Sequence, residues 1–125
     1  MTDQWTPIEI ESRLRGLVTE LTQAQGALAD QRDAEVRAKH AYEAERRKAL
    51  LSDECPKVTR GGWTTTERDA WVDEQVKDVR WRFDLATVRR EAAQDHLRVL
   101  RDQAEIVRSL GASVRQAYEV AGRMP

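Results

Sequence analysis

The side chains that most often catalyse reactions or bind metals are sparse in this chain of 125 residues. It contains two histidines, His40 and His96, and one cysteine, Cys55. Asp53, Glu54 and Cys55 stand together, but their spacing from His40 matches no known set of zinc ligands. A single cysteine also excludes an internal disulfide framework and a zinc site built from cysteines. We therefore expect no catalytic centre, no metal and no other cofactor, and predict that the protein is not an enzyme.

Basic and aromatic side chains gather between residues 46 and 71 and point to a different chemistry. Guanidinium and ammonium groups neutralise phosphates, and exposed indoles stack on unpaired bases, so this mixture is typical of a surface that binds single-stranded nucleic acid. Trp63 stands beside two glycines in the connection and is the aromatic residue that we most expect to be exposed. The candidate nucleic-acid-binding residues are Arg46, Arg47, Lys48, Lys57, Arg60, Trp63, Arg68 and Trp71.

Acidic residues are interleaved with these basic residues and leave a second interpretation open. Glu43 and Glu45 would form ordinary ion pairs with basic residues one helical turn away. The basic residues would then be only a solvated face, and Trp71 and Trp81 would pack in an interface. The chain has 21 Lys+Arg and 22 Asp+Glu, a formal net charge of −1. This balance excludes a histone-like protein that coats nucleic acid by bulk charge.

Start signals and apolar periodicity predict a first helix from about residue 7 to about residue 52. In Thr6–Glu9, threonine can cap the helix, proline suits its first position and Glu9 completes a capping box. Apolar residues then recur at steps of four and three, and no proline interrupts them before Pro56. The apolar positions are Ile10, Leu14, Leu17, Leu21, Ala24 and Leu28, followed by a thinner series at Ala34, Ala38, Ala41, Tyr42, Leu50 and Leu51.

A connection and a second long helix follow. Residues 53–64 contain a proline, a double glycine and no periodicity, which predicts a loop. A second capping box, Thr64 to Glu67, opens a helix from about 65 to about 121. Its 3.5-residue repeat is typical of a coiled-coil seam, and because the repeat keeps its phase at Gly111 we favour a continuous helix over a break there. The seam positions are Val72, Val76, Val79, Phe83, Ala86, Arg90, Ala93, Leu97, Leu100, Ala104, Val107, Gly111, Val114, Tyr118 and Ala121.

Two long helices joined by one connection predict an all-α fold, a long antiparallel helical hairpin that resembles a coiled coil and forms a single domain over residues 1–125. The second helix carries another apolar line, which we call the second stripe. Because an apolar stripe needs a partner, we expect a homodimer that forms a four-helix assembly. The second stripe consists of Trp81, Leu85, Val88, Ala92, Val99, Ile106 and Leu110, and Asp95, His96 and Asp102 interrupt it.

Targeting signals are not evident. Residues Met1–Trp5 lack the basic and apolar regions of a secretory signal, and no apolar run approaches the roughly 18 residues needed to span a bilayer. The single thiol is compatible with a reducing compartment. We therefore expect a cytoplasmic protein with no membrane partner.

Five short stretches carry a resemblance to a known group of proteins: Ala38–Glu43, Arg46–Leu51, Thr65–Ala70, Leu97–Arg101 and Arg108–Leu110. They resemble small helical, coiled-coil proteins of tailed bacteriophages, particularly phages of actinobacteria, and the resemblance covers most of the chain. Genes of that group are often found near single-strand annealing recombinases and single-strand binding proteins. The resemblance therefore implies a phage-encoded accessory protein in the cytoplasm of the host bacterium.

Together these observations predict a non-enzymatic phage accessory protein that assists DNA recombination or replication. It would act through contacts with a protein partner, either a recombinase or a host protein, and would also bind single-stranded DNA. Two other functions remain open. One is an inhibitor of a host protein or defence system that acts by binding only, through the connection and the second stripe. The other is a structural or assembly component of the virion.

Circular dichroism tests the all-α prediction. The two periodic segments should give more than about two-thirds helix, whereas helices make up about one-third of an ordinary globular protein. A spectrum well below two-thirds helix would contradict the prediction.

Overall fold

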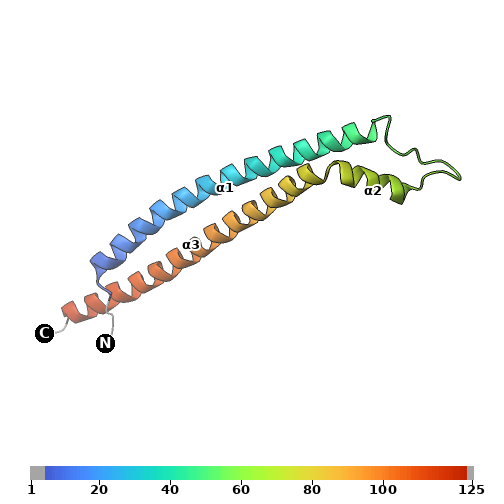
Figure 1. Cartoon of the computed structure of the whole chain (residues 1–125). Helices are drawn as coiled ribbons and strands as arrows, with labels where there is room; N and C mark the ends of the chain where they lie inside the picture. The colour runs from blue at the N-terminus through green and yellow to red at the C-terminus, as the bar shows by residue number, and fades with distance from the viewer. Residues whose placement is uncertain (1–4, 124–125) are drawn as a thin grey trace. The chain divides into compact units, whose positions relative to one another are not determined.

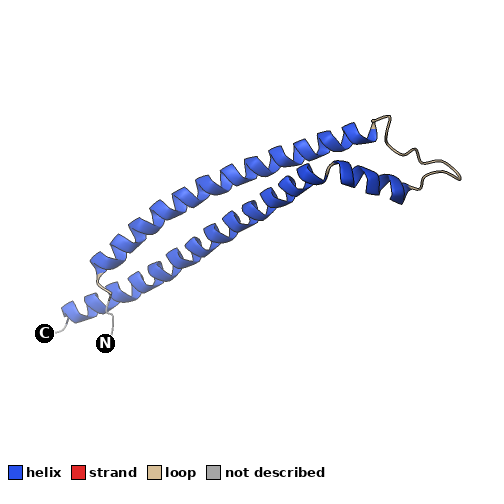
Figure 2. Ribbon diagram, viewed as in Figure 1, coloured by secondary structure: helices blue, strands red, loops and turns tan. Residues whose placement is uncertain are grey.

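The structure, a computed structural model, describes residues 5–123 and is all-helical. It contains three helices, α1 (Pro7–Leu50), α2 (Thr65–Gln75) and α3 (Lys77–Arg123), shown in Figure 1. Figure 2 shows only helices and loops in this described part, and the two long helices α1 and α3 pack together. The predicted fold class, a helical hairpin, is therefore confirmed.

Contacts divide the chain into two compact units. The terminal unit contains the described residues of Met1–Ala29 and Ala92–Pro125, and the connection unit contains Asp30–Glu91. Each unit holds one part of α1 and one part of α3, and the connection unit also holds α2. The single hairpin domain over residues 1–125 stays a prediction.

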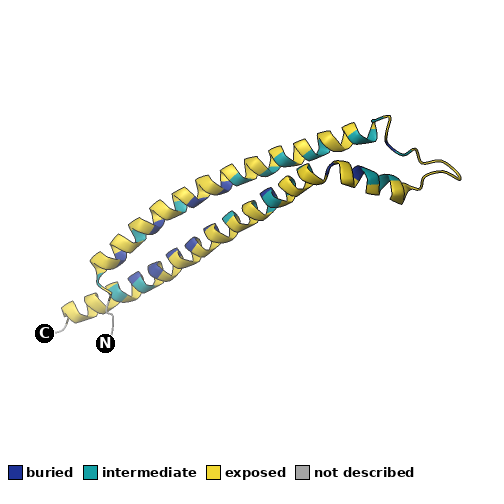
Figure 3. Ribbon diagram, in the orientation of Figure 1, coloured by how far each residue is buried: buried dark blue, intermediate teal, exposed yellow. Residues whose placement is uncertain are grey.

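The core of the terminal unit is an apolar seam between α1 and α3, visible as buried residues on the facing sides of the helices in Figure 3. A Cβ at Gly111 would lie 3.0 Å from Cγ2 of Ile10, so the absence of a side chain there lets the start of α1 approach the end of α3. This contact requires the two helices to run antiparallel. The buried seam residues are Ile10, Leu17, Ala24, Leu28, Leu97, Leu100, Ala104 and Val107.

A charged pair lies in the seam of the connection unit. The Arg90 guanidinium donates hydrogen bonds to both carboxylate oxygens of Glu35, at N···O distances of 3.1–3.2 Å. The two side chains are 24% and 20% exposed. The hydrogen bonds from Arg90 lower the pKa of Glu35, helped by one from Thr87 and by the Arg90 charge and opposed by desolvation. This two-pronged geometry fixes how α1 and α3 align within the connection unit.

The sequence did not predict Glu35 as a seam residue. Continuing the steps of three and four beyond Leu28 reaches Gln31, Glu35, Ala38 and Tyr42, and all four side chains are half-buried. The thinner apolar series was therefore wrong at Ala34 and Ala41, which are exposed. The prediction followed apolar residues only, whereas the seam contains polar side chains here. Glu35 of α1 pairs with Arg90, the one charged residue among the predicted seam positions of α3.

The prediction of one helix over about 65–121 was wrong at Val76, where the backbone leaves helical geometry with φ −108° and ψ 12°. Val72 and Val76 are both buried, so the apolar seam continues through the break and its repeat shows no slip. Valine is β-branched and has a weak helix propensity, so the valines at 72, 76 and 79 lower the free-energy cost of interrupting the helix there. The continuity predicted at Gly111 is confirmed. The first helix ends at Leu50, two residues before the predicted end.

Replacing Glu35 with Gln should lower the melting temperature, because Arg90 then keeps a half-buried charge without a compensating carboxylate. Since folding lowers the pKa of Glu35, the stabilisation is fully present above the unfolded carboxyl pKa of about 4.3 and is lost as the pH falls through the lower folded pKa. The difference in melting temperature between wild type and Glu35→Gln should therefore be largest near pH 7 and shrink in acid.

Thermal unfolding followed by circular dichroism measures this difference. Asp33→Asn is a matched control, because it breaks the exposed Arg37–Asp33 pair and should have little effect at any pH. An effect of Glu35→Gln that is the same at neutral and acid pH would contradict a role for the carboxylate charge.

Candidate nucleic-acid interface

The connection, residues 51–64, joins α1 to α2 and holds the central candidate residues. Its first part is anchored by Cys55, which is buried and donates its backbone N–H to the Ser52 carbonyl at 3.1 Å. The Glu54 backbone N–H donates to Ser52 Oγ at 3.2 Å. The connection therefore leaves α1 through a hydrogen-bonded turn.

A tight turn over Thr59–Gly62 presents Arg60 and Trp63. The Gly62 N–H donates to the Thr59 carbonyl at 3.0 Å, and Gly61 has φ +80°, as the third position of a type II turn requires. A Cβ at Gly62 would lie 2.3 Å from Thr59 Oγ1, so any other residue there would require the Thr59 hydroxyl to move. A backbone bridge pairs Val58 with Trp63 across this turn. Trp63 is 52% exposed, which agrees with the sequence-based expectation of an exposed indole.

The connection ends at a well-formed helix start. Thr64 Oγ1 accepts a hydrogen bond from the Glu67 N–H at 3.1 Å, and Glu67 Oε1 accepts one from the Thr64 N–H at 3.3 Å. This capping box confirms the predicted start of α2. Because α2 starts directly after Trp63, the indole is held next to a fixed element.

Five of the predicted basic residues are exposed and free of ion pairs. Each has a rotatable, solvated cationic group, and within residues 5–123 none forms an ion pair with a carboxylate. Between Cys55 and Thr66 the chain contains no acidic residue at all. The five basic residues are Arg46, Arg47 and Lys48 in the last turns of α1 and Lys57 and Arg60 in the connection.

The other two candidate residues, Arg68 and Trp71, are less exposed to solvent. Arg68 is half-buried and donates to Asp69 Oδ1 through Nε and Nη2, at 3.3 and 3.2 Å. Trp71 is also half-buried in α2. The structure therefore divides the predicted set into six exposed residues, in the last turns of α1 and in the connection, and a partly covered pair on α2, and all eight residues belong to the connection unit.

A hollow of about 420 Å³ in the connection unit is lined by Trp81 of the second stripe and by residues that the sequence did not suggest as a site. The Arg80 guanidinium lies 5.2 Å from the centre of the Tyr42 ring, and its Nη1 donates to the Tyr42 hydroxyl at 3.3 Å. Arg80 Nε also donates to Asp84 at 3.2 Å. The side chain of Trp81, 67% exposed, lines the edge. Paired charges leave little positive potential here, so we do not place nucleic acid in this hollow.

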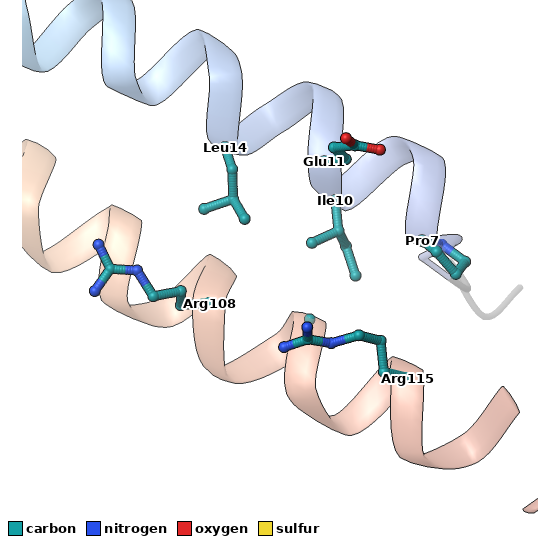
Figure 4. A pocket seen from close by; sticks show the side chains of 7 residues that line it. Pro7, Ile10, Glu11, Leu14, Arg108 and Arg115 are labelled. Atoms are coloured by element: carbon teal, nitrogen blue, oxygen red, sulfur yellow. The ribbon is translucent and has the colours of Figure 1, made fainter. Parts of the chain in front are cut away.

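Figure 4 shows another hollow, of about 380 Å³, in the terminal unit between α1 and α3. Ile10 and Leu14 line it from α1, and Arg108 and Arg115 line it from α3. Arg108 is paired with Glu105 at 2.7 Å, so only part of the cationic charge at the rim is uncompensated. This mixture of apolar and charged side chains does not indicate a particular class of ligand.

No three His, Cys, Asp or Glu side chains among residues 5–123 are placed to hold a metal ion. No helix in that range is long and apolar enough to cross a membrane. His40 and His96 are both exposed and belong to different units.

The second stripe is mainly exposed. Trp81 and Ile106 are each 67% exposed, Val88 is 60% and Val99 is 50% exposed. Ala92 is also exposed, whereas Leu85 and Leu110 are half-buried. These positions lie on α3 and leave one face of that helix apolar and open to a partner.

No family model, curated protein or solved structure matches the chain.

Proposed function

We propose that the protein is a non-enzymatic binding protein whose connection binds single-stranded nucleic acid. The observation that supports this most strongly is the exposed indole of Trp63, which follows a glycine turn. Lys57 and Arg60 precede it in the connection, and both are exposed and form no ion pair within residues 5–123. An exposed indole can stack on another flat ring, and an unpaired base has such a ring. The basic groups supply the attraction for phosphate that positions the strand.

Single strands should be preferred over duplex because the bases of a duplex are already stacked on one another. Trp63 can stack only on a base that is free to turn towards it. The basic residues contact the backbone of either form, so they provide affinity without sequence preference. The chemistry therefore fits a short stretch of unpaired nucleic acid of any sequence.

The balance of charges limits the affinity. Asp53 and Glu54 lie close to the basic residues in sequence, and the whole chain has a formal net charge of −1. Carboxylates repel phosphate within a Debye length of about 8–10 Å, so they weaken binding more as the salt concentration falls. We therefore expect moderate affinity from one chain.

The proposed setting is DNA recombination or replication of a phage, in the cytoplasm of an infected bacterium. The resemblance to helical phage proteins supports this setting, and single-stranded DNA is an intermediate of both processes. The exposed second stripe supports a further role in protein–protein contacts, with a second copy of the chain, a recombinase or a host protein as partner. The same stripe also favours the second candidate function, a phage inhibitor that binds a host protein.

Fluorescence anisotropy with a labelled, unstructured DNA strand tests nucleic-acid binding. Trp63→Ala should weaken binding by about 1–3 kcal/mol, the usual contribution of one stacked base. Trp5→Ala is the matched control, because Trp5 is also exposed but lies in the terminal unit, and it should leave binding unchanged. Absence of binding to the wild-type protein at tens of micromolar and low salt would contradict the proposal.

The salt dependence separates phosphate binding from stacking. Replacing Lys57 and Arg60 with Gln should lower the binding constant and make its logarithm fall less steeply with the logarithm of salt concentration. The slope should change by about 0.7 for each phosphate of the single strand that the protein no longer neutralises. Trp63→Ala should leave the slope unchanged. The same change to Gln at Arg13 and Arg101, exposed basic residues of the terminal unit, is the control and should alter neither affinity nor slope. An unchanged slope in the Lys57 and Arg60 variant would contradict their role in binding phosphate.

A further inference from the structure

The buried apolar cluster shared by α1 and α3 lies, among residues 5–123, entirely in the terminal unit. From Asp30 to Leu50, α1 contributes no buried residue. The part of α3 that belongs to the connection unit contributes one, Ala86, whose side chain is a single methyl group. The other buried residues of this unit, Cys55, Val72 and Val76, lie outside the two long helices. In the connection unit, α1 and α3 therefore bury very little apolar surface against each other.

Polar and partly hydrated contacts hold the two helices together there. Besides the pair of Glu35 with Arg90, the Tyr42 ring lies 6.0 Å from the half-buried Phe83 ring, measured between their centres, and the Tyr42 hydroxyl accepts a hydrogen bond from the exposed Arg80. Water can replace such hydrogen bonds and ion pairs when the helices separate, so each contributes little net stability. A buried apolar side chain contributes more, because water offers it no replacement contact.

We infer that the connection unit opens on its own: residues 30–50 of α1 separate from residues 77–91 of α3 while the seam of the terminal unit stays closed. Proteins open locally where few apolar contacts are buried, at a lower free energy than unfolding of the whole molecule requires. A helix segment that loses its partner is only marginally stable in water, since most helical stability in proteins comes from packing. The opened unit therefore exposes its backbone amides as well as its side chains.

Opening gives the proposed strand-binding residues freedom to adjust. Trp63 and the candidate basic residues all belong to the connection unit, and segments that bind ligands are commonly the least stable part of a protein. The inference goes beyond the proposed function, because opening depends only on the contacts across the seam. Its test uses no nucleic acid, so either proposal can fail while the other stands.

Hydrogen exchange of the full chain, followed by mass spectrometry, measures the opening. Residues 14–21 and 36–43 lie equally far from the two ends of α1, so fraying of the helix alone would protect both segments equally. If the connection unit opens on its own, residues 36–43 should exchange about tenfold faster or more, relative to the rates of the unfolded chain. Residues 79–91 of α3 should likewise exchange faster than residues 97–107.

Changes at the charged pair should move this protection in opposite directions. Glu35→Gln leaves Arg90 without its carboxylate, so it should speed exchange of residues 36–43 and leave residues 14–21 unchanged. Combining Glu35→Leu with Arg90→Met should slow exchange of residues 36–43, because apolar side chains of similar volume often stabilise a protein when they replace a buried ion pair. Asp33→Asn is the matched control, since it breaks an exposed pair in the same unit and should change neither segment.

The opposite results would overturn the inference. Equal protection of the two α1 segments would mean that the hairpin opens as one cooperative structure, and so would an equal effect of Glu35→Gln on both segments. Faster exchange of residues 14–21 than of residues 36–43 would place the weaker seam in the terminal unit. Unchanged exchange in the variant that combines Glu35→Leu with Arg90→Met would contradict the polar seam as the cause of opening.

Discussion

The rest of the structure depends on the narrow seam that α1 and α3 bury against each other. Each long helix covers only the side chains that recur at steps of four and three, so most of its surface stays in water. In the terminal unit the seam is apolar, and Gly111 permits a close approach of the two helices. In the connection unit the ion pair of Glu35 with Arg90 aligns the two helices. A fold with so little enclosed volume is suited to binding on its outer surfaces and at its connection.

Periodicity and capping made most of this fold predictable from the sequence. Thr64 and Glu67 form the expected box, and the seam positions of the second helix from Val72 to Val114 are all buried or half-buried. The predicted seam was wrong at Tyr118 and Ala121, which are exposed. The break at Val76 was not predictable from the pattern, because a buried valine continues the repeat on both sides of it. Glu35 was missed for the opposite reason: a carboxylate interrupts an apolar pattern and becomes a seam residue only when Arg90 lies across from it.

The candidate site was predictable to a similar extent. The double glycine indicated an open turn, and the exposure of Trp63 follows from that turn. Sequence alone could not decide which basic residues would find carboxylates, because pairing depends on how side chains reach one another in space. Arg68 bonds its neighbour Asp69, whereas Arg46 and Arg47 form no ion pair among the described residues despite Glu43 and Glu45 nearby. The hydrogen bond from Arg80 to the Tyr42 hydroxyl was not predictable from the sequence either, because it joins residues 38 positions apart.

The two proposed surfaces would act together in a dimer. One connection has few basic groups and nearby carboxylates, so a single chain should hold a strand only moderately. A dimer carries two connections, and once one of them holds a strand, the second binding event becomes intramolecular whenever the strand is long enough to reach it. Apparent affinity then rises without any new contact, and it rises more for long single strands than for short ones. Near-neutral net charge is therefore compatible with selective binding of long unpaired DNA, because the selectivity comes from the number of sites and not from the charge of the chain.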